Sequence, residues 1–523
     1  MTRWLTRRLR DERGFTMIIA IGVMFVTSLM LVAAFTIANG EVATTHTDTN
    51  QKQAYYAALA GIQEYEYKLQ ANPNYWETCA EPKSTVPEEA SERYEVALLP
   101  ASSAPEGTKT CSTSNPFSTM IEAKGTIANT FRIKSTGFAG KEKKAIIATF
   151  KVTGFLDFIY YTNFETEDPA LYRAPTGCAE QYYAAWSKAG LKCETIVFTS
   201  GDSVEGPMHT NDATRIEGSA EFGRAKQTPP DAIEINGGTY PEDSGEKCSG
   251  GKPVFNTTSG CYTTKGQTLV PPPSDTSLTS YVEEANEFEG QTKLTLEGAA
   301  NKIAVVTYTY NAKKEFVEAK KTIEWPKNGL IYVSQMAGVS CAAPFESTSS
   351  DEATEIKERR PCGDVYVSGS YKESLTIAAE ENVIITGNVW PTSVEGKIGN
   401  EPPTTSTAVL GLIANNYVRV YHPCTGSGNQ SGSLENPWIY AAMLATTHSF
   451  LVDNYNCGRA LGELHVWGAI AQDYRGIVGQ VGGSGYIKDY KYDNRLATDE
   501  PPYFLAPLKS GWKIARETAP RPG

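Results

Sequence analysis

The hydrophobic pattern of the N-terminal region is dominated by one uninterrupted apolar run. From Phe15 to Ala38 the chain carries no charged residue. At a rise of 1.5 Å per residue, this run would form a helix of roughly 36 Å, enough to cross a hydrocarbon core of about 30 Å. We therefore predict one membrane-spanning helix, whose residues include Phe15, Ile19, Val23, Leu29 and Ala38.

The residues after this run predict that the helix continues as an amphipathic segment to Gln70. Polar residues now alternate with apolar ones, and Pro73 is expected to end the helix. The apolar positions recur at helical spacing. They are Tyr55, Leu59, Ile62 and Leu69.

The pattern then changes to one typical of strands. Residues 71–115 are loop-like, and alternating runs at 130–134 and 145–152 predict a small antiparallel sheet within residues 71–195. In residues 196–523, β-runs begin near Val383, Val409, Ile439 and Leu464, about 25–30 residues apart. This spacing favours a parallel β-helix with insertions at 226–302 and 340–360; a β-sandwich is the alternative.

The ten cysteines all lie beyond the apolar run, and none forms a Cys-x-x-Cys pair. An even number outside a membrane indicates disulfides rather than a zinc ribbon or redox motif. Pairing between nearest neighbours would close loops of about 13 to 33 residues, each contributing about 2–4 kcal/mol. The predicted pairs are Cys79–Cys111, Cys178–Cys193, Cys248–Cys261, Cys341–Cys362 and Cys424–Cys457.

The charge distribution predicts the orientation of the helix and excludes one class of partner. Five arginines and two acids precede Gly14, so this flank should remain cytoplasmic and the remainder should lie outside. The net charge is −12, and removing the flank's +3 leaves −15 for the exported part. Nucleic acid is therefore not an expected partner, because its phosphates require clustered Lys and Arg.

The position of Gly14, between the basic flank and the apolar run, helps to distinguish three possible kinds of N-terminal segment. A secretory signal would have a shorter apolar region, and a plain signal anchor would need no glycine here. The order of basic leader, Gly14, Phe15 and apolar helix resembles the class III signal of type IV pilins and pseudopilins. The resemblance implies that a prepilin peptidase cleaves between Gly14 and Phe15 and that Phe15 becomes methylated.

Two further features refine this resemblance. The block Ala54–Glu64 is similar to the stretch of PilX-like pilins in which the long helix meets the globular head. Major pilins usually carry Glu at the fifth mature position, which here is Ile19. Its absence resembles PilX-like minor pilins and the tip pseudopilin of type II secretion, and it argues against a repeating shaft subunit.

No active site is predicted. The best polar cluster is His209 with Asn211 and Asp212, and such residues at the corner of a β-helix more often bond the backbone. His422, His448 and His465 are isolated in the sequence. Motifs for a nucleophile elbow, a zinc protease, an EF-hand or a phosphate-binding loop are absent from the sequence. We expect no enzyme activity, no cofactor and no metal.

The predicted fold class is α+β, divided into a basic leader (1–14), a pilin helix (15–70), a pilin-like strand region (71–195) and a mainly-β head (196–523). The predicted function is that of a minor pilin-like component that helps to initiate or cap a filament. Expected partners are other pilins, prepilin peptidase, the membrane, and a surface glycan or protein ligand. The expected location is the cytoplasmic membrane and then the pilus or cell surface. Alternatives are a membrane-anchored surface-binding protein and a polysaccharide-degrading β-helix enzyme.

Overall fold

A computed structural model gives the structure of the chain, which divides into two compact units. The first unit contains the N-terminal helix and a small sheet, and the second runs from Val152 to Gly511. The described residues are 15–72, 75–84, 92–101, 111, 120, 130–172, 177–179, 181–184, 196–240, 253–257, 260–311, 313, 315–341, 359–425, 428–508 and 512–518.

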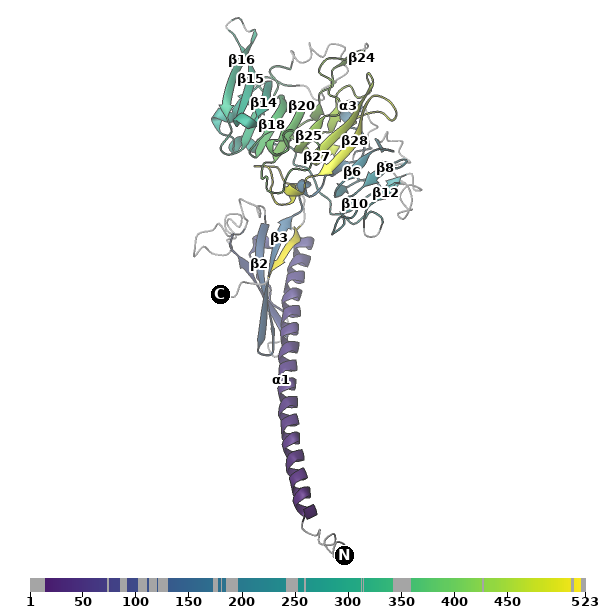
Figure 1. Ribbon diagram of the computed structural model, residues 1–523. Coiled ribbons are helices and arrows are strands. Elements are labelled where there is room, and N and C mark those ends of the chain that lie inside the picture. Colours follow the sequence, from purple (N-terminus) through teal and green to yellow (C-terminus); the bar gives the residue numbers. More distant parts are fainter. Residues whose placement is uncertain are drawn as a thin grey trace, which may run out of the picture. The chain divides into compact units, whose positions relative to one another are not determined.

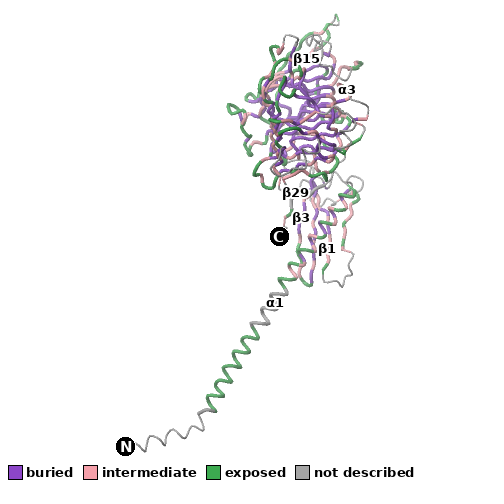
Figure 2. The backbone as a smooth tube through the Cα atoms, turned by 90° about the vertical axis from the view of Figure 1, so that its right-hand side faces the viewer, coloured by how far each residue is buried: buried purple, intermediate pink, exposed green. Residues whose placement is uncertain are grey.

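The first unit is built on one long helix, α1 (Phe15–Ala71), of 57 residues. Its described N-terminal part is exposed, whereas residues near its C-terminal end alternate between exposed and buried (Figure 2). A four-stranded sheet in the order β1-β2-β3-β29 packs on that C-terminal part. Among the described residues, the other elements of this unit are η1 (Tyr75–Thr78), β1 (Glu92–Leu99), β2 (Thr130–Ala139), β3 (Glu142–Val152) and β29 (Trp512–Thr518).

The face of α1 that packs on the sheet agrees with the predicted one at Ile62 and Leu69 and differs from it at Tyr55. Tyr55 is 45% exposed, so its predicted place on the apolar face is wrong. The helix approaches β2 so closely that a Cβ on Gly137 would lie 2.0 Å from the Ala54 carbonyl oxygen. Small residues are needed at such a contact. The buried residues of this face are Ala54, Ala58, Gly61, Ile62, Tyr65 and Leu69.

Aromatic rings fill the space between α1 and the sheet. Tyr65 is fully buried, and its ring centroid lies 6.0 Å from that of Phe131 and 5.8 Å from that of Phe150. Phe131 and Phe150 are themselves stacked at 5.3 Å. These contacts fix the C-terminal part of α1 on the antiparallel strands β2 and β3, as the amphipathic pattern predicts.

We expect Tyr65→Phe to leave the free energy of unfolding unchanged or to raise it by about 1 kcal/mol. The Tyr65 hydroxyl is buried without a hydrogen-bond partner among the described residues, and an unpaired buried hydroxyl is unfavourable. Denaturant unfolding of the full chain in detergent would measure the change. Tyr67→Phe, on the exposed side of α1, is the control. A clear loss of stability in Tyr65→Phe alone would show that the hydroxyl has a partner.

The second unit is built from strands that pair in parallel with strands from neighbouring turns of the chain (Figure 1). The longest ladder passes through nine strands, all parallel to their neighbours. In spatial order these are β13 (Glu287–Glu289), β17 (Leu330–Ser334), β19 (Leu375–Ala379), β21 (Leu410–Ala414), β25 (Trp438–Ala445), β27 (Ala460–Tyr474), β4 (Tyr160–Phe164), β7 (Met208–Thr210) and β10 (Ile233–Ile235).

Further parallel ladders extend the same arrangement. One contains β14 (Thr292–Glu297), β18 (Val365–Tyr371), β20 (Val383–Pro391), β22 (Val418–Val420) and β26 (Phe450–Val452). Another continues from β27 through β28 (Gly485–Tyr492), β6 (Ser203–Glu205), β9 (Glu221–Phe222) and β12 (Val254–Phe255). A third contains β5 (Val197–Phe198), β8 (Thr214–Ile216) and β11 (Thr239–Tyr240).

Antiparallel pairing also occurs in the described part of this unit, at three hairpins. β15 (Lys302–Tyr310) pairs antiparallel with β14 and with β16 (Phe316–Glu324). β23 (Cys424–Thr425) pairs with β24 (Gly428–Asn429). The short helical elements are η2 (Phe155–Asp157), α3 (Pro169–Tyr172), η4 (Thr276–Ser280), η5 (Glu284–Asn286), η6 (Gly298–Ala300), η7 (Thr392–Val394) and η8 (Asn494–Ala497).

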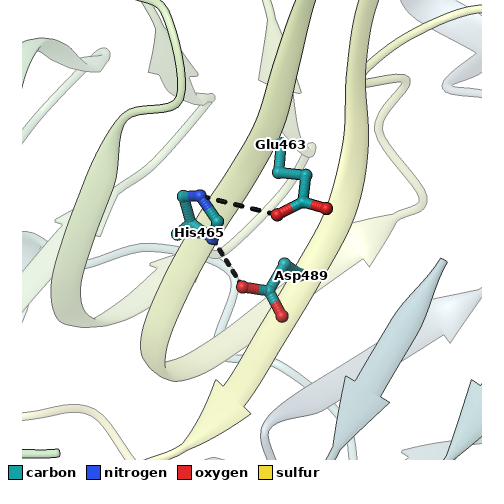
Figure 3. A group of neighbouring side chains, drawn as sticks. All are labelled: Glu463, His465 and Asp489. Atoms are coloured by element: carbon teal, nitrogen blue, oxygen red, sulfur yellow. Dashed lines mark hydrogen bonds and ion pairs between the residues drawn. The ribbon is translucent and has the colours of Figure 1, made fainter. Parts of the chain in front are cut away.

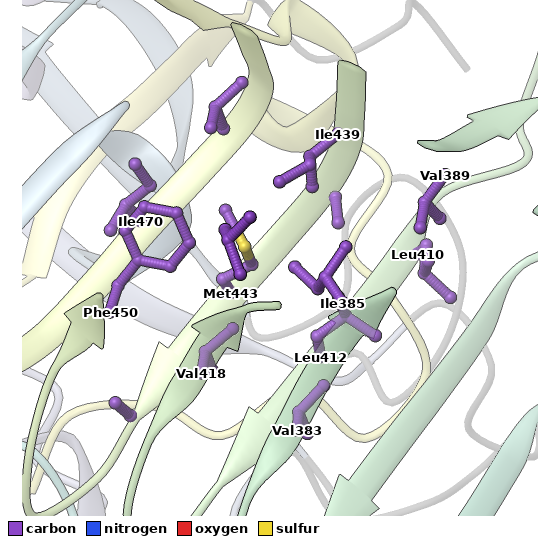
Figure 4. Close-up of a cluster of buried hydrophobic side chains, with 14 of the residues drawn as sticks. Val383, Ile385, Val389, Leu410, Leu412, Val418, Ile439, Met443, Phe450 and Ile470 are labelled. Atoms are coloured by element: carbon purple, nitrogen blue, oxygen red, sulfur yellow. The ribbon is translucent and has the colours of Figure 1, made fainter. Parts of the chain in front are cut away.

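Apolar side chains from successive strands of the ladders meet in one buried cluster. Ile385, Leu412 and Met443 project into the same interior from β20, β21 and β25 (Figure 4). All three are 0% exposed. Because each strand contributes only a few such residues, the core forms only when neighbouring strands stack.

The described part of segment 226–302 belongs to these ladders and is not an insertion. β10, β12, β13 and β14 each pair in parallel with another strand of the unit. The prolines and turns of the segment conceal these short strands in the sequence. The same segment contains two short helical turns, η4 and η5. Residues 342–358 of the predicted second insertion lie outside the described residues.

The division between the units also differs from the predicted domain boundaries. It falls at Lys151 and Val152 and not at residue 195. The physical reason is that β4 pairs with β27 and β7, inside the long ladder. β29 lies beside β3, so the last described strand belongs to the helix-containing unit and not to the head.

Three predicted disulfide pairings are confirmed. They are Cys79–Cys111, Cys341–Cys362 and Cys424–Cys457. Cys178 and Cys261 are also disulfide-bonded, but their predicted partners, Cys193 and Cys248, lie outside the described residues. The confirmed bonds each close a local loop, of 32, 21 and 33 residues in sequence separation.

Candidate functional site

The N-terminal part of α1 is long and apolar enough to cross a membrane. The segment Met17–Thr36 has 20 residues and a mean hydropathy of 2.6, and none of it is buried by the rest of the chain. Of the predicted residues, Ile19, Val23 and Leu29 are each just over half exposed. A continuous exposed surface of this kind requires an apolar surround, such as lipid or other apolar helices.

The two threonine hydroxyls of this segment are hydrogen-bonded within the helix itself. The hydroxyl of Thr27 donates to the Val23 carbonyl oxygen at 2.8 Å, and that of Thr36 donates to the Val32 carbonyl oxygen at 3.0 Å. Hydrogen bonds to the preceding turn leave no hydroxyl donor unpaired at these positions. These two hydroxyls therefore meet the requirement that lipid imposes on polar groups.

The predicted processing residues lie at the edge of the described chain. Phe15 is the first residue of α1, and Gly14 lies outside the described residues. Ala38 is helical, but its side chain is not described.

The polar cluster at His209 is saturated by bonds within the fold. His209 is fully buried on β7, with Nδ1 2.6 Å from Glu234 Oε2 and Nε2 3.0 Å from Asn211 Oδ1. The Asp212 carboxylate accepts hydrogen bonds from the backbone N–H groups of Tyr183 and Ala213. These bonds connect His209 on β7 with Glu234 on β10 and tie Asp212 to the backbone.

Two further histidines also contact parts of the chain that are distant in sequence. The ring nitrogens of His422 lie 3.0 Å from the Asp453 carbonyl oxygen and 3.3 Å from Asn429 Oδ1. His448 Nδ1 lies 2.7 Å from Asp168 Oδ2. Near His448, burial raises the pKa of Asp473 to about 6, although a hydrogen bond from the Asn163 amide opposes the shift.

The fourth histidine lies in a cluster that the sequence does not reveal. Glu463 and His465 are two residues apart on β27. The parallel register places Asp489 of β28 directly beside His465. His465 Nδ1 lies 2.5 Å from Asp489 Oδ2, and Nε2 lies 3.7 Å from Glu463 Oε2, so the ring stands between the two carboxylates (Figure 3).

The surroundings of this cluster fix the histidine ring. The indole of Trp438 on β25 stacks on His465, with ring centroids 3.9 Å apart and planes 7° apart. Lys491 Nζ donates to Asp489 Oδ2 at 3.0 Å. Burial alone would raise the pKa of Asp489, but the hydrogen bonds from His465 and Lys491 together lower it. A charged, oriented carboxylate therefore holds the histidine.

Comparisons with known proteins add little to this description. No protein-family model and no curated protein matches the chain. Among solved structures, the crystal structure of the competence-associated pilin ComZ from Thermus thermophilus is similar at a TM-score of 0.25 and 11% sequence identity. The alignment covers 90% of this chain and 98% of that chain. A TM-score this low supports no argument about the fold or function of this chain.

Proposed function

We propose that this protein is a minor pilin-like component of a type IV pilus or a related secretion filament. The observation that carries the proposal is the continuous helix α1. Its segment Met17–Thr36 is apolar and uncovered, and its C-terminal part packs on a small antiparallel sheet. One helix thus offers an apolar surface for lipid or sister helices and a rigid attachment for the exported chain.

The proposed assembly follows from the chemistry of the two ends of this segment. The arginine-rich flank keeps residues 1–14 cytoplasmic, where prepilin peptidase would cleave between Gly14 and Phe15. The freed helix would then leave the bilayer by packing laterally on the helices of other pilins. Ile19, in place of an acidic residue, suits a component that starts or caps a filament and does not repeat along it.

We further propose that the second unit is a parallel β-helix that is displayed outside the cell. The in-register parallel ladders and the buried apolar cluster between their strands support this reading over a β-sandwich. The second unit, Val152–Gly511, spans 360 residues, and a compact unit of that size has a radius of gyration of roughly 21 Å, far wider than the helix that carries it. Such a head at every shaft position would crowd the filament, which favours a tip or low-copy position.

The role proposed for this head is adhesion to a surface glycan or protein, or contact with partner pilins. Catalysis is not part of the proposal. His209, the best catalytic candidate in the sequence, has both ring nitrogens engaged by Glu234 and Asn211. An enzyme acting on polysaccharide would be recognised by release of sugars from glycan mixtures.

The proposal predicts that Gly14→Ala blocks processing. With the glycine replaced, the peptidase should leave the precursor intact, and the protein should remain in the membrane with its leader attached. Intact-mass measurement of membrane-extracted protein would show the leader of 14 residues retained, and N-terminal sequencing of the unsubstituted chain would begin at methylated Phe15.

Gly22→Ala is the matched control, because Gly22 lies inside the apolar segment and a Cβ there meets no atom within 4 Å. It should be processed normally. The proposal is wrong if the unsubstituted chain keeps its leader in cells that contain the peptidase and never co-purifies with filaments. The protein would then be a membrane-anchored surface protein.

A further inference from the structure

The cluster of Glu463, His465 and Asp489 has a feature that its hydrogen bonds do not explain. His465 is only 9% exposed, and its Nδ1 is held by the Asp489 carboxylate at 2.5 Å. A carboxylate acts only as an acceptor, so Nδ1 carries the hydrogen in the neutral ring. Nε2 then presents a lone pair, and it has no hydrogen-bond partner among the described residues.

The lone pair of Nε2 faces another acceptor. Glu463 Oε2 lies 3.7 Å away, beyond hydrogen-bond distance, and Glu463 approaches from the more exposed side. Two electron-pair donors that face each other across this gap are stabilised by a cation between them. A metal ion about 2.1 Å from each atom would subtend an angle of roughly 120°, close to the angle in tetrahedral zinc sites.

We propose that His465 Nε2 and Glu463 bind a divalent transition metal of the Zn²⁺ class, with Asp489 as the positioning residue for the imidazole. A ligating histidine that donates its other N–H to a carboxylate is the arrangement that fixes the tautomer and raises the basicity of the ligand. Imidazole nitrogen favours Zn²⁺ over Mg²⁺ or Ca²⁺, which take oxygen ligands.

The surrounding residues make the arrangement rigid. Trp438 stacks on the ring, Lys491 holds Asp489, and the three strands β25, β27 and β28 are in register at these positions. The side chain of Glu463 is 55% exposed, so an ion can reach the site from solvent and retain water at its other positions.

Isothermal titration calorimetry, with ZnCl₂ titrated into the full chain in detergent at pH 7.5, tests the proposal. One Zn²⁺ per chain is expected, and Co²⁺ in its place should give visible d–d bands. His465→Gln and Glu463→Gln should each abolish this binding. Asp489→Asn should weaken it about 10- to 100-fold while the cobalt bands remain, as expected for a residue that acts through the ligand.

His448→Gln is the matched control. His448 also bonds an aspartate through Nδ1, but among the described residues no carboxylate is paired with its other nitrogen. It should bind Zn²⁺ like the unsubstituted chain. The proposal is overturned if the unsubstituted chain binds no Zn²⁺ at millimolar concentration, or if a bound ion survives both His465→Gln and Glu463→Gln. Glu463→Gln changes an exposed side chain, so circular dichroism should confirm that it folds.

Discussion

Glu165→Gln is expected to destabilise the second unit by about 3–5 kcal/mol. Glu165 and Arg475 form a salt bridge in which Arg475 Nη1 lies 2.9 Å from Glu165 Oε2, and both residues are 1% exposed. The substitution leaves a guanidinium buried without its counter-charge, and an uncompensated buried charge carries a penalty of this size. Denaturant unfolding of the full chain in detergent would measure the loss.

The position of this salt bridge explains why its loss should destabilise the whole second unit. Arg475 follows β27, and Glu165 follows β4, the two strands that join chain segments more than 300 residues apart. The same guanidinium donates to the Ile196 carbonyl oxygen at 2.9 Å and lies over the Phe198 ring at 3.7 Å. One side chain therefore connects three separate segments of the unit.

A double-mutant cycle separates the pair from the general effect of substitution. Arg475→Met combined with Glu165→Gln should lose less than the sum of the single losses, because no charge remains buried. The exposed pair Arg459–Glu435 is the matched control, and Arg459→Met should change stability by at most about 1 kcal/mol. Additive losses in the buried pair would show that the two charges are not coupled.

Features encoded locally were predictable from the sequence. The apolar run from Phe15 needs only a charge-free stretch of sufficient length, and the confirmed disulfides join nearest cysteines. The part of the packing face of α1 near Gly137 was not predictable, because close approach there selects small residues such as Ala54 over the larger Tyr55. Hydrophobicity alone ranks these residues in the wrong order for such a contact.

Features that depend on register between distant segments could not be predicted. The sequence places β4 in the region of the small sheet, but β4 pairs with β27, which begins 300 residues further along the chain. The sequence also did not reveal the cluster of Glu463, His465 and Asp489, because Asp489 lies beside His465 only through the parallel pairing of β27 and β28. The one local signal was the alternation of Glu463 and His465, which places both on the same face of a strand.

The stability of the second unit should fall with rising pH through the ionisation of Asp275. This residue is fully buried; its Oδ1 accepts a hydrogen bond from the Tyr332 hydroxyl at 3.0 Å, and its Oδ2 has no partner among the described residues. Burial raises its pKa to about 7 from an ordinary 3.8; the bond from Tyr332 opposes the shift, and the charge of Glu380 adds to it. The folded chain therefore holds this proton where the unfolded chain has released it.

The sign of the effect follows from the direction of the shift. Below about pH 4 both states are protonated, and the contribution of Asp275 to stability is fully present. Between about pH 4 and 7 only the unfolded state ionises, so this contribution is lost progressively. Above pH 7 the loss is complete, and a shift of about three units corresponds to roughly 4 kcal/mol.

Asp275→Asn should remove this dependence, because the amide does not ionise and its oxygen can still accept from Tyr332. The variant should match the unsubstituted chain near pH 4 and exceed its free energy of unfolding by up to roughly 4 kcal/mol at pH 8. Denaturant unfolding at both pH values measures the difference, and Glu284→Gln, an exposed carboxylate nearby in the chain, is the control. If Asp275→Asn and the unsubstituted chain differ in free energy of unfolding by the same amount at both pH values, the prediction is wrong. Asp275 would then keep one protonation state across this pH range. Because Leu278 and Tyr332 share one buried cluster, the pH-dependent loss should also appear as faster hydrogen exchange in β17.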